Sequence, residues 1–236
     1  MLSILTYNIR YGEKLHDIIQ WLIQRNTAFD IICFQEFPIA KIDTFLSSIE
    51  VTNYDYRFSN GFKKRNKQYG QLTLFKRKDI KILDDTVLSL GSSVLERSKT
   101  KGERSSLLTR FSYKDKQFLL ANTHLVCFAL NKKRLVQLEK IIKHFASVAD
   151  SKLPILVVGD FNYSSLIRQK KLLDYMEGHG FINAYKTHTF KLLFLKYQLD
   201  YVFYKNCEIN NVDVLKLNFS DHFPAEFQLD LHISAN

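Results

Sequence analysis

The stretch LPILVVGDFNYSS, residues 153–165, carries two side chains that could do chemistry. Aliphatic residues lead into Gly159, and Asp160 and Asn162 follow with one phenylalanine between them. In an extended segment, side chains two residues apart point to the same face, so this carboxylate and this amide would meet the same ligand. A carboxylate can orient or deprotonate a water, and an amide can donate to an anion without adding charge. The stretch therefore predicts a buried strand that ends at a polar site.

Polar side chains also stand where other apolar runs end. These further candidates are Asn8, Glu36, His124, Asp200, Asp221 and His222. Each of them alone has a structural explanation, such as a turn residue, a helix N-cap or a satisfied core histidine. Together they supply the carboxylates, amides and imidazoles that a hard cation and a phosphate require, and folded sheets bring strand ends together. We therefore expect the set to converge on one site.

The apolar spacing predicts the elements that must position these side chains. Short apolar runs indicate strands at 3–8, 29–36, 69–76, 80–89, 104–112 and 116–126, and at the run into Asp160. Apolar residues at helical spacing indicate helices at 13–26, 39–49, 131–149 and 164–177, followed by β-rich sequence to the end. Antiparallel pairs mixed with helical crossovers favour an α/β fold of two mixed β-sheets packed face to face, with helices on the outside.

Length and composition favour one domain. The chain has 236 residues, 46% of them hydrophobic, and no stretch rich in glycine, serine or proline interrupts it. We therefore predict a single domain over residues 1–236. The start of the chain lacks a basic region followed by a long apolar one, and no apolar run approaches the roughly 20 residues of a membrane span. These features predict a cytoplasmic protein without a transmembrane segment. The three cysteines, far apart and odd in number, suggest neither a disulfide framework nor a zinc site.

The charge of the chain favours an anionic partner. The 34 Lys and Arg outnumber the 24 Asp and Glu and give a formal charge of +10. The excess is clustered in KKRNK (63–67), KRK (76–78), NKKR (131–134) and RQKK (168–171). A solvated surface is the usual explanation of one such cluster. A basic surface attracts nucleic acid and phosphorylated lipid headgroups alike, so both partners stay open.

One basic cluster stands where a helix should begin. Lys132, Lys133 and Arg134 occupy the first turn of the helix expected near 131, where the helix dipole disfavours cations by up to about 1 kcal/mol each. The cluster follows His124 by under a dozen residues, which predicts a place at the rim of the site. A substrate phosphate chain that crosses this rim would compensate for the unfavourable placement. The three residues are therefore candidates for substrate binding.

Eight short motifs together resemble the endonuclease/exonuclease/phosphatase superfamily, which has the deoxyribonuclease-I-like fold. They are TYNIR, FQE, YGQLTLF, GERSSLLTRF, NTHL, GDFN, LDYVF and SDHFP, in the order of the family over residues 5–224. One such motif alone would be weak evidence, whereas eight in order are strong evidence. The resemblance implies a four-layer sandwich of two sheets between helices, and hydrolysis of phosphoester bonds with Mg²⁺ or Mn²⁺.

In-line attack of water on a phosphodiester assigns roles to part of the set. The site must neutralise the non-bridging oxygens, deprotonate the water and stabilise the leaving oxygen. Mg²⁺ prefers oxygen ligands and uses one or two carboxylates, which suits Glu36 as the main ligand, with Asn8 and Asp221 close by. Asp160 would orient or deprotonate the water, and Asn162 would hold the phosphate.

The resemblance implies roles for the remaining candidates. His222 would pair with Asp200, which fixes its tautomer, and would serve as a phosphate clamp or as an acid/base. His124, in NTHL, would contact the phosphate or help to protonate the leaving group. The substrate-binding set consists of Tyr69 and Arg104, both in quoted motifs, with Lys132, Lys133 and Arg134.

The substrate class is less strongly indicated. We expect a nuclease that acts on DNA or RNA; the alternatives are a phosphoinositide or phospholipid phosphoesterase and an inactive binding protein on the same fold. Apurinic-site enzymes use bulky aromatic residues late in the chain to hold an extruded sugar. The only tryptophan here, Trp21, lies on the helix expected at 13–26 and should be in the core, so specificity for such damage is not supported. QLDYVFY stands where the inositol-phosphatase branch has a CDR-type motif, and this difference weighs against that branch. Every expected polar position is filled, which favours catalysis over binding alone.

Overall fold

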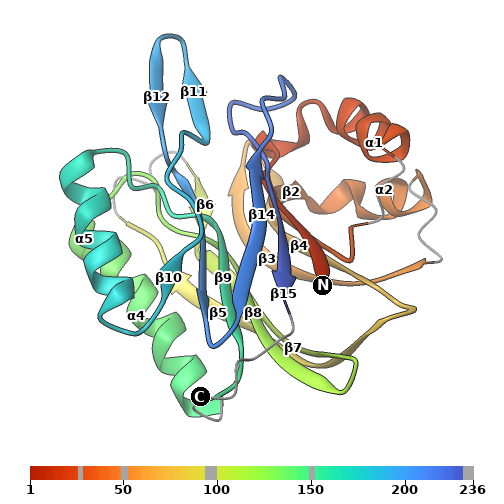
Figure 1. Cartoon of the computed structure of the whole chain (residues 1–236). Coiled ribbons are helices and arrows are strands. Elements are labelled where there is room, and N and C mark those ends of the chain that lie inside the picture. The colour runs from red at the N-terminus through yellow and green to blue at the C-terminus, as the bar shows by residue number, and fades with distance from the viewer. Residues whose placement is uncertain (26–28, 49–52, 94–99, 149–151, 231–236) are drawn as a thin grey trace.

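Two β-sheets packed face to face form the centre of the computed structural model (Figure 1), which describes residues 1–25, 29–48, 53–93, 100–148 and 152–230. Within these ranges the first sheet has seven strands, in the spatial order β14 (Glu208–Val214), β15 (Ala225–Asp230), β1 (Leu2–Asn8), β2 (Ile31–Pro38), β4 (Lys67–Lys76), β3 (Tyr54–Lys64) and β6 (Lys101–Gly102). The second has six, in the order β10 (Ile182–Asn183), β13 (Asp200–Lys205), β9 (Ile155–Asp160), β8 (Lys116–His124), β7 (Arg104–Tyr113) and β5 (Ile80–Gly91).

Helices cover the outer faces of both sheets. Helices α1 (Leu15–Gln24) and α2 (Ile42–Ser48) pack on the first sheet, whereas α4 (Asn131–Val148) and α5 (Leu166–Glu177) pack on the second (Figure 1). Two short 3-10 helices, η1 (Arg10–Gly12) and η2 (Ile39–Lys41), follow β1 and β2. This arrangement confirms the four-layer α/β sandwich expected from the sequence. None of the helices in the described ranges combines the length and apolarity that a bilayer crossing demands.

Apolar side chains fill the three spaces between the four layers. The space between the sheets contains Ile4, Cys33, Phe111, Val158 and Phe227. The outer space on the first sheet contains Ile18, Phe34 and Phe45, with Trp21 packed against this cluster. The outer space on the second sheet contains Leu138, Phe145, Val157 and Leu172. Because β2 and β9 are buried on both faces, their sequences are nearly continuous apolar runs.

The predicted elements lie close to those of the structure, with three differences. The helix expected at 39–49 begins as η2 directly after Pro38, and α2 follows it. Strand β3 was not predicted, although its aromatic residues Tyr54, Tyr56 and Phe58 alternate as strand residues do. The hairpin of β11 (Phe190–Leu192) and β12 (Leu195–Tyr197) was expected only as unspecified β-rich sequence. Residues 26, 49 and 149, at the ends of three expected helices, lie outside the described residues.

Candidate active site

Three adjacent strands of the second sheet place three predicted side chains in a row. The parallel pair β8 and β9 aligns His124 with Asp160, and the antiparallel pair β9 and β13 aligns Asp160 with Asp200. Gly159, just before Asp160, has a φ of +127°, and a Cβ there would lie 2.0 Å from the carbonyl oxygen of Thr123. Only glycine permits this close approach of the two backbones, so Gly159 is required for the alignment.

The first sheet contributes Asn8 and Glu36 from the ends of its central parallel strands. The β1–β2 pairing aligns Asn8 with Gln35, the residue before Glu36. The β2–β4 register shifts between Phe34 and Phe37, and within this irregularity Glu36 has a φ of 58°. A non-glycine residue in this left-handed region costs about 1–3 kcal/mol and persists only where the surrounding structure enforces it. The irregularity turns the Glu36 carboxylate to the site rather than along the regular strand face.

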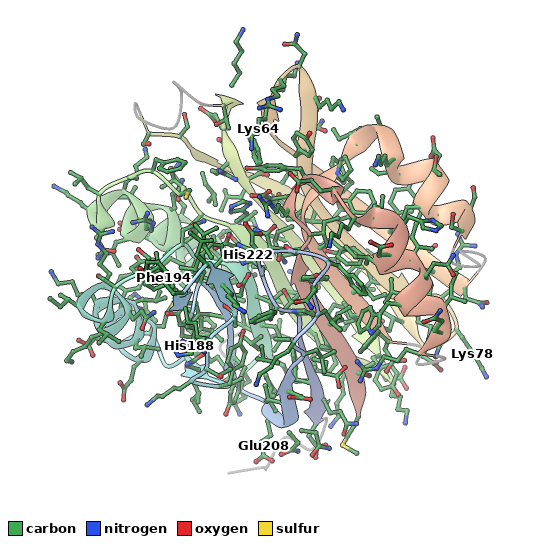
Figure 2. The ribbon with its side chains drawn as sticks, turned by 90° about the horizontal axis from the view of Figure 1, so that it is seen from above. Lys64, Lys78, His188, Phe194, Glu208 and His222 are labelled. Atoms are coloured by element: carbon green, nitrogen blue, oxygen red, sulfur yellow. The ribbon has the colours of Figure 1, made fainter. Side chains whose placement is uncertain are left out.

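One cavity of about 440 Å³ collects most of the predicted side chains. Those that line it are Asn8, Glu36, Arg104, His124, Asp160, Asn162, Asp221 and His222. Asp200 is not in the lining but hydrogen-bonds to His222 from behind. Figure 2 looks down on this face of the molecule, with His222 near its centre. The convergence expected from the strand ends is therefore present, and it draws on both sheets.

Asp160 is the hub of the polar contacts in the cavity. Its Oδ2 accepts a hydrogen bond from Asn8 Nδ2 at 3.0 Å, and its Oδ1 accepts one from the backbone N–H of Asn162 at 2.9 Å. Nε2 of His124 lies 3.4 Å from the same Oδ2. Burial raises the pKa of Asp160 to about 7, while the positive charge of His222 opposes this rise. A carboxyl with a pKa near neutrality can take up a proton from water, as a general base must.

His222 is held by Asp200 in its protonated form. Its Nδ1 lies 2.7 Å from Asp200 Oδ2, and because a carboxylate only accepts, Nδ1 is the donor. Burial alone would lower the pKa of His222, but the charge and hydrogen bond of Asp200, with Asp160 and Asp221, raise it to about 10. The other ring nitrogen, Nε2, lies 3.8 Å from Asp160 Oδ2 on the cavity side. His222 thus presents a charged donor to whatever enters the cavity.

His124 has the opposite charge state. Burial and the positive charge of Arg104 hold the pKa of His124 well below its ordinary value, so its imidazole is neutral at pH 7. Arg104 Nη1 lies 3.0 Å from both ring nitrogens, and its guanidinium sits over the Phe62 ring, 4.0 Å from the centroid. The cavity therefore pairs one cationic histidine with one neutral histidine, which are the states needed for separate acid and acceptor roles.

The oxygen ligands in the cavity fit a divalent cation. Burial raises the pKa of Glu36, and Arg104 and His222 partly offset this effect. A buried carboxylate becomes favourable in its ionised form beside a cation, and Asn8 and Asp221 offer further oxygen atoms in the same cavity.

A second group of possible ligands lies at and behind the cavity wall. Ligand atoms of Asp160, Asp200 and His222 lie within 4.8 Å of one another. This group is the poorer fit, because His222 Nδ1 and Asp200 Oδ2 are already engaged with each other in a hydrogen bond of 2.7 Å. We therefore favour the oxygen set of Glu36, Asn8 and Asp221.

Several lining residues were not singled out in the sequence. They are Arg10, Tyr11, Lys64, Thr100, Cys127, Phe128, Phe190 and Leu199. Arg10 Nε lies 3.6 Å from Asp221 Oδ2, and Lys64 Nζ lies 3.7 Å from the centroid of the Tyr11 ring. Arg10 belongs to the TYNIR motif and Lys64 to the KKRNK cluster, so a closer look at the cations within quoted motifs could have found both.

Four predicted substrate-binding residues lie outside the cavity lining. Tyr69 packs behind it, with its ring 5.1 Å from that of Tyr11, a lining residue. Lys132 is exposed and Lys133 is half-buried in the first turn of α4. Arg134 is buried, and its guanidinium donates to the backbone carbonyls of the segment between β8 and α4. A direct contact between these four side chains and a substrate stays a prediction.

Arg134→Ala is expected to destabilise the fold. The side chain donates to the carbonyl oxygen of Val126 at 2.9 Å and of Ala129 at 3.1 Å, and also to that of Cys127. Loss of charged donors, with acceptors left unsatisfied, should lower the free energy of unfolding by about 2–4 kcal/mol, as measured by urea denaturation. Lys132→Ala, an exposed control in the same turn, should change it by less than about 0.5 kcal/mol. If the Arg134 variant kept its stability and had a raised KM, Arg134 would bind the substrate rather than stabilise the fold.

Comparison with known proteins identifies the relatives of the chain. The model of a family described as "Endonuclease/Exonuclease/phosphatase family" matches residues 5–222, which confirms the resemblance seen in the motifs. A UPF0294 protein of Vibrio vulnificus (strain YJ016) is 27% identical over 225 residues, or 94% of this chain and 75% of that protein.

Solved structures share the fold at low identity. A mannosyl-6-phosphatase of Bacteroides thetaiotaomicron is 18% identical with a TM-score of 0.75, covering 98% of this chain and 100% of that one. D. rerio TDP2, complexed with a single-strand DNA product, is 14% identical with a TM-score of 0.74, covering 97% and 98%. At these identities the likeness shows the fold alone.

Proposed function

We propose that this chain, which belongs to the endonuclease/exonuclease/phosphatase family, hydrolyses phosphodiester bonds by in-line attack of water with Mg²⁺ or Mn²⁺, and that residues 1–236 form one catalytic domain. Members of this family are hydrolases that act on phosphoester bonds. The observation that carries the proposal is the cavity in which a buried carboxylate, a cationic histidine and a neutral histidine surround Asp160.

The residues of the cavity divide the work of hydrolysis among them. Glu36, with Asn8 and Asp221, would hold the metal, which when bound stabilises negative charge on the non-bridging oxygens. Asp160, fixed by two hydrogen bonds, orients the attacking water and accepts its proton. Of the two histidines, His222 is cationic and His124 is neutral. His222 can therefore donate a proton while Asp160 accepts one.

Phosphate oxygens meet two donors of this chain. Asn162 Nδ2 donates one hydrogen to the Leu125 carbonyl oxygen at 3.0 Å, which orients the amide and directs its second hydrogen to the substrate. His222 donates from Nε2 to a phosphate oxygen or to the leaving oxygen, and Asp200 keeps the imidazolium in place. Two oriented donors on one phosphate give the geometric control that in-line attack requires.

A substrate screen tests the proposed reaction. Bis(p-nitrophenyl) phosphate, single- and double-stranded DNA, RNA, phosphoinositides and sphingomyelin would each be incubated with Mg²⁺, with Mn²⁺ and with EDTA. We expect metal-dependent turnover of at least one diester, and its loss in EDTA. Absence of turnover from the whole screen would contradict the proposal and favour a binding protein on the same fold.

Nucleic acid is the first candidate substrate class, and Lys132 and Lys133 test it. Lys132→Glu with Lys133→Glu is expected to raise KM for a polynucleotide by about tenfold or more, because neutralised phosphates release counterions. KM for bis(p-nitrophenyl) phosphate should change little. Wild-type affinity for the polynucleotide should also fall steeply as salt is raised.

A matched pair of charge reversals controls for net charge. Lys78, in the turn between β4 and β5, and Lys81, at the start of β5, are both exposed. Because β4 runs antiparallel to β2, this turn lies at the opposite end of the sheet from Glu36. Lys78→Glu with Lys81→Glu should leave both KM values near the wild-type ones. Equal effects of the Lys132 and Lys133 reversals on the long and the short substrate, or a flat salt response, would point to a compact substrate.

A phosphorylated lipid headgroup is the second candidate substrate. The observation in its favour is the hairpin of β11 and β12, which has an apolar tip and whose first residue, Phe190, lines the cavity. The substrate screen separates the two classes, since it contains both lipid and nucleic-acid phosphodiesters.

A further inference from the structure

A two-stranded hairpin, β11 and β12, projects from the molecule (Figure 1), and its first residue, Phe190, lines the cavity. Strands β11 and β12 pair antiparallel, and Leu193 and Phe194 connect them at the tip. The side chains of Leu193 and Phe194 are 80% and 83% exposed. Large apolar groups at a protruding tip expose surface that would be more stable away from water. The tip therefore has the character of a contact surface rather than of a solvated loop.

Other exposed apolar side chains begin the two helices that follow the catalytic strands. Leu130 lies just before α4, and Leu166 and Ile167 form the first turn of α5. With Leu193 and Phe194, they are the five most exposed large apolar side chains in the described part of the chain. Because α4 and α5 follow the strands that end at His124 and Asp160, their first turns lie at the cavity end of the second sheet. We call these five residues the apolar tips.

Exposed cations accompany the apolar tips. Lys191 and Lys196 face each other directly across the hairpin, and like charges in that position destabilise a strand pair. Arg168, near the start of α5, and Lys186, before the hairpin, are exposed and line the groove between these two segments. The opposed lysines are understandable if an anionic partner lies across them.

The base of the hairpin is joined to the catalytic segment. Phe190 forms an isolated β-bridge with His222, and their rings are 4.9 Å apart in an edge-on arrangement. The backbone N–H of Lys191 donates to the carbonyl oxygen of Asp221 at 2.9 Å. Figure 2 looks down on the face that carries both Phe194 and His222. Whatever binds the tip is thus held beside the mouth of the cavity.

We propose that the apolar tips and their lysines dock this protein onto an anionic lipid surface, with the cavity turned toward the lipid headgroups. Four of the five tips are aliphatic, and the five stand on three separate exposed segments, which suits shallow insertion between acyl chains. Bases would stack on aromatic side chains, and protein hot spots favour Trp, Tyr and Arg, so neither partner matches this composition as well. Juxtamembrane lysines add attraction to anionic lipid.

The test of docking does not depend on catalysis. The docking proposal rests on the proposed function only in the statement that docking brings a substrate to the cavity. Such docking would bring the second candidate substrate, a phosphorylated lipid headgroup, to Asp160 and His222. Binding is measured in EDTA, and turnover is measured separately with bis(p-nitrophenyl) phosphate, so that failure of one is not failure of the other.

Vesicle sedimentation tests the docking surface. Wild-type protein should sediment with vesicles of phosphatidylcholine and phosphatidylserine, less with phosphatidylcholine alone, and less as salt rises. Leu193→Ser with Phe194→Ser should weaken binding by at least about tenfold, because the apolar area is lost. Lys191→Glu with Lys196→Glu should weaken binding to the anionic vesicles alone, also by about tenfold or more. The variant with serine at Leu193 and Phe194 should turn over bis(p-nitrophenyl) phosphate at the wild-type rate. This rate would show that the variant is folded.

A matched apolar pair completes the test. Leu83 and Val87 on β5 are 39% and 45% exposed, away from the tips. Leu83→Ser with Val87→Ser should sediment as the wild type does. The proposal is overturned if the wild type stays in the supernatant with anionic vesicles, if both serine pairs bind equally well, or if the Leu193 and Phe194 pair instead weakens binding to a polynucleotide.

Discussion

Glu36→Gln is expected to remove divalent-metal binding and to lower kcat by about 10²–10³-fold or more, the scale of losing one preorganised electrostatic group. Glutamine keeps the shape of the side chain but cannot supply the anionic oxygens that Mg²⁺ prefers. Calorimetric titration of Mg²⁺ and Mn²⁺ into both proteins measures the binding directly. The fold should be retained, because burial already disfavours the ionised form of Glu36 and raises its pKa.

The stability of the Glu36 variant provides a second measurement. A ligand present at a hundred times its Kd stabilises the folded state by about 2.7 kcal/mol, so Mg²⁺ should raise the Tm of the wild type and not that of Glu36→Gln. Glu139→Gln is the matched control, since Glu139 is exposed on α4, pairs with Lys143 and lies outside the lining. Equal metal affinity in Glu36→Gln and the wild type would exclude Glu36 as a ligand.

Much of the fold could be predicted because burial dictates the residue pattern of the central strands. Strand β9 is buried along its whole length and is apolar up to Asp160, its last residue. Strand β3 escaped prediction because exposed and half-buried positions alternate with few fully buried ones, and charged residues obscure its period. The hairpin at 190–197 posed a different difficulty. Its sequence FKLLFLKY has the composition of a buried strand, yet the structure leaves its apolar tip in water. Composition alone does not distinguish a core strand from a contact surface.

The candidate site could be predicted as a set of residues but not as a geometry. Strand-end position was a sufficient signal for His124, Asp160 and Asp200, because pairing across three adjacent strands aligns them. The left-handed backbone of Glu36 has no signature in a single sequence, since glutamate is not a residue that favours it. The opposite charge states of the two histidines depend on burial and neighbours, which only the folded chain supplies.

Alanine at Asp160, Asn162 or His222 is expected to reduce kcat by about 10²–10⁴-fold, and the double variants should lose little more than the worse single variant. The geometry is the reason. Asp160 Oδ1 accepts from the backbone N–H of Asn162, and its Oδ2 faces His222 Nε2 at 3.8 Å, so loss of the Asp160 carboxylate removes contacts that place both neighbours. Steady-state rates on bis(p-nitrophenyl) phosphate with saturating metal would be compared in a double-mutant cycle for each pair.

The cycle also separates a shared catalytic unit from independent effects on stability. His179→Ala removes an exposed imidazole that contacts the Tyr175 carbonyl oxygen, so combining it with Asp160→Ala should multiply the separate effects within error. Losses that are non-additive among Asp160, Asn162 and His222, but additive with His179, would mean that the three residues act together in one catalytic step. Additive losses throughout would mean that Asp160 and His222 act in separate steps, and the assignment of Asp160 as the base that works with a cationic His222 would have to be abandoned.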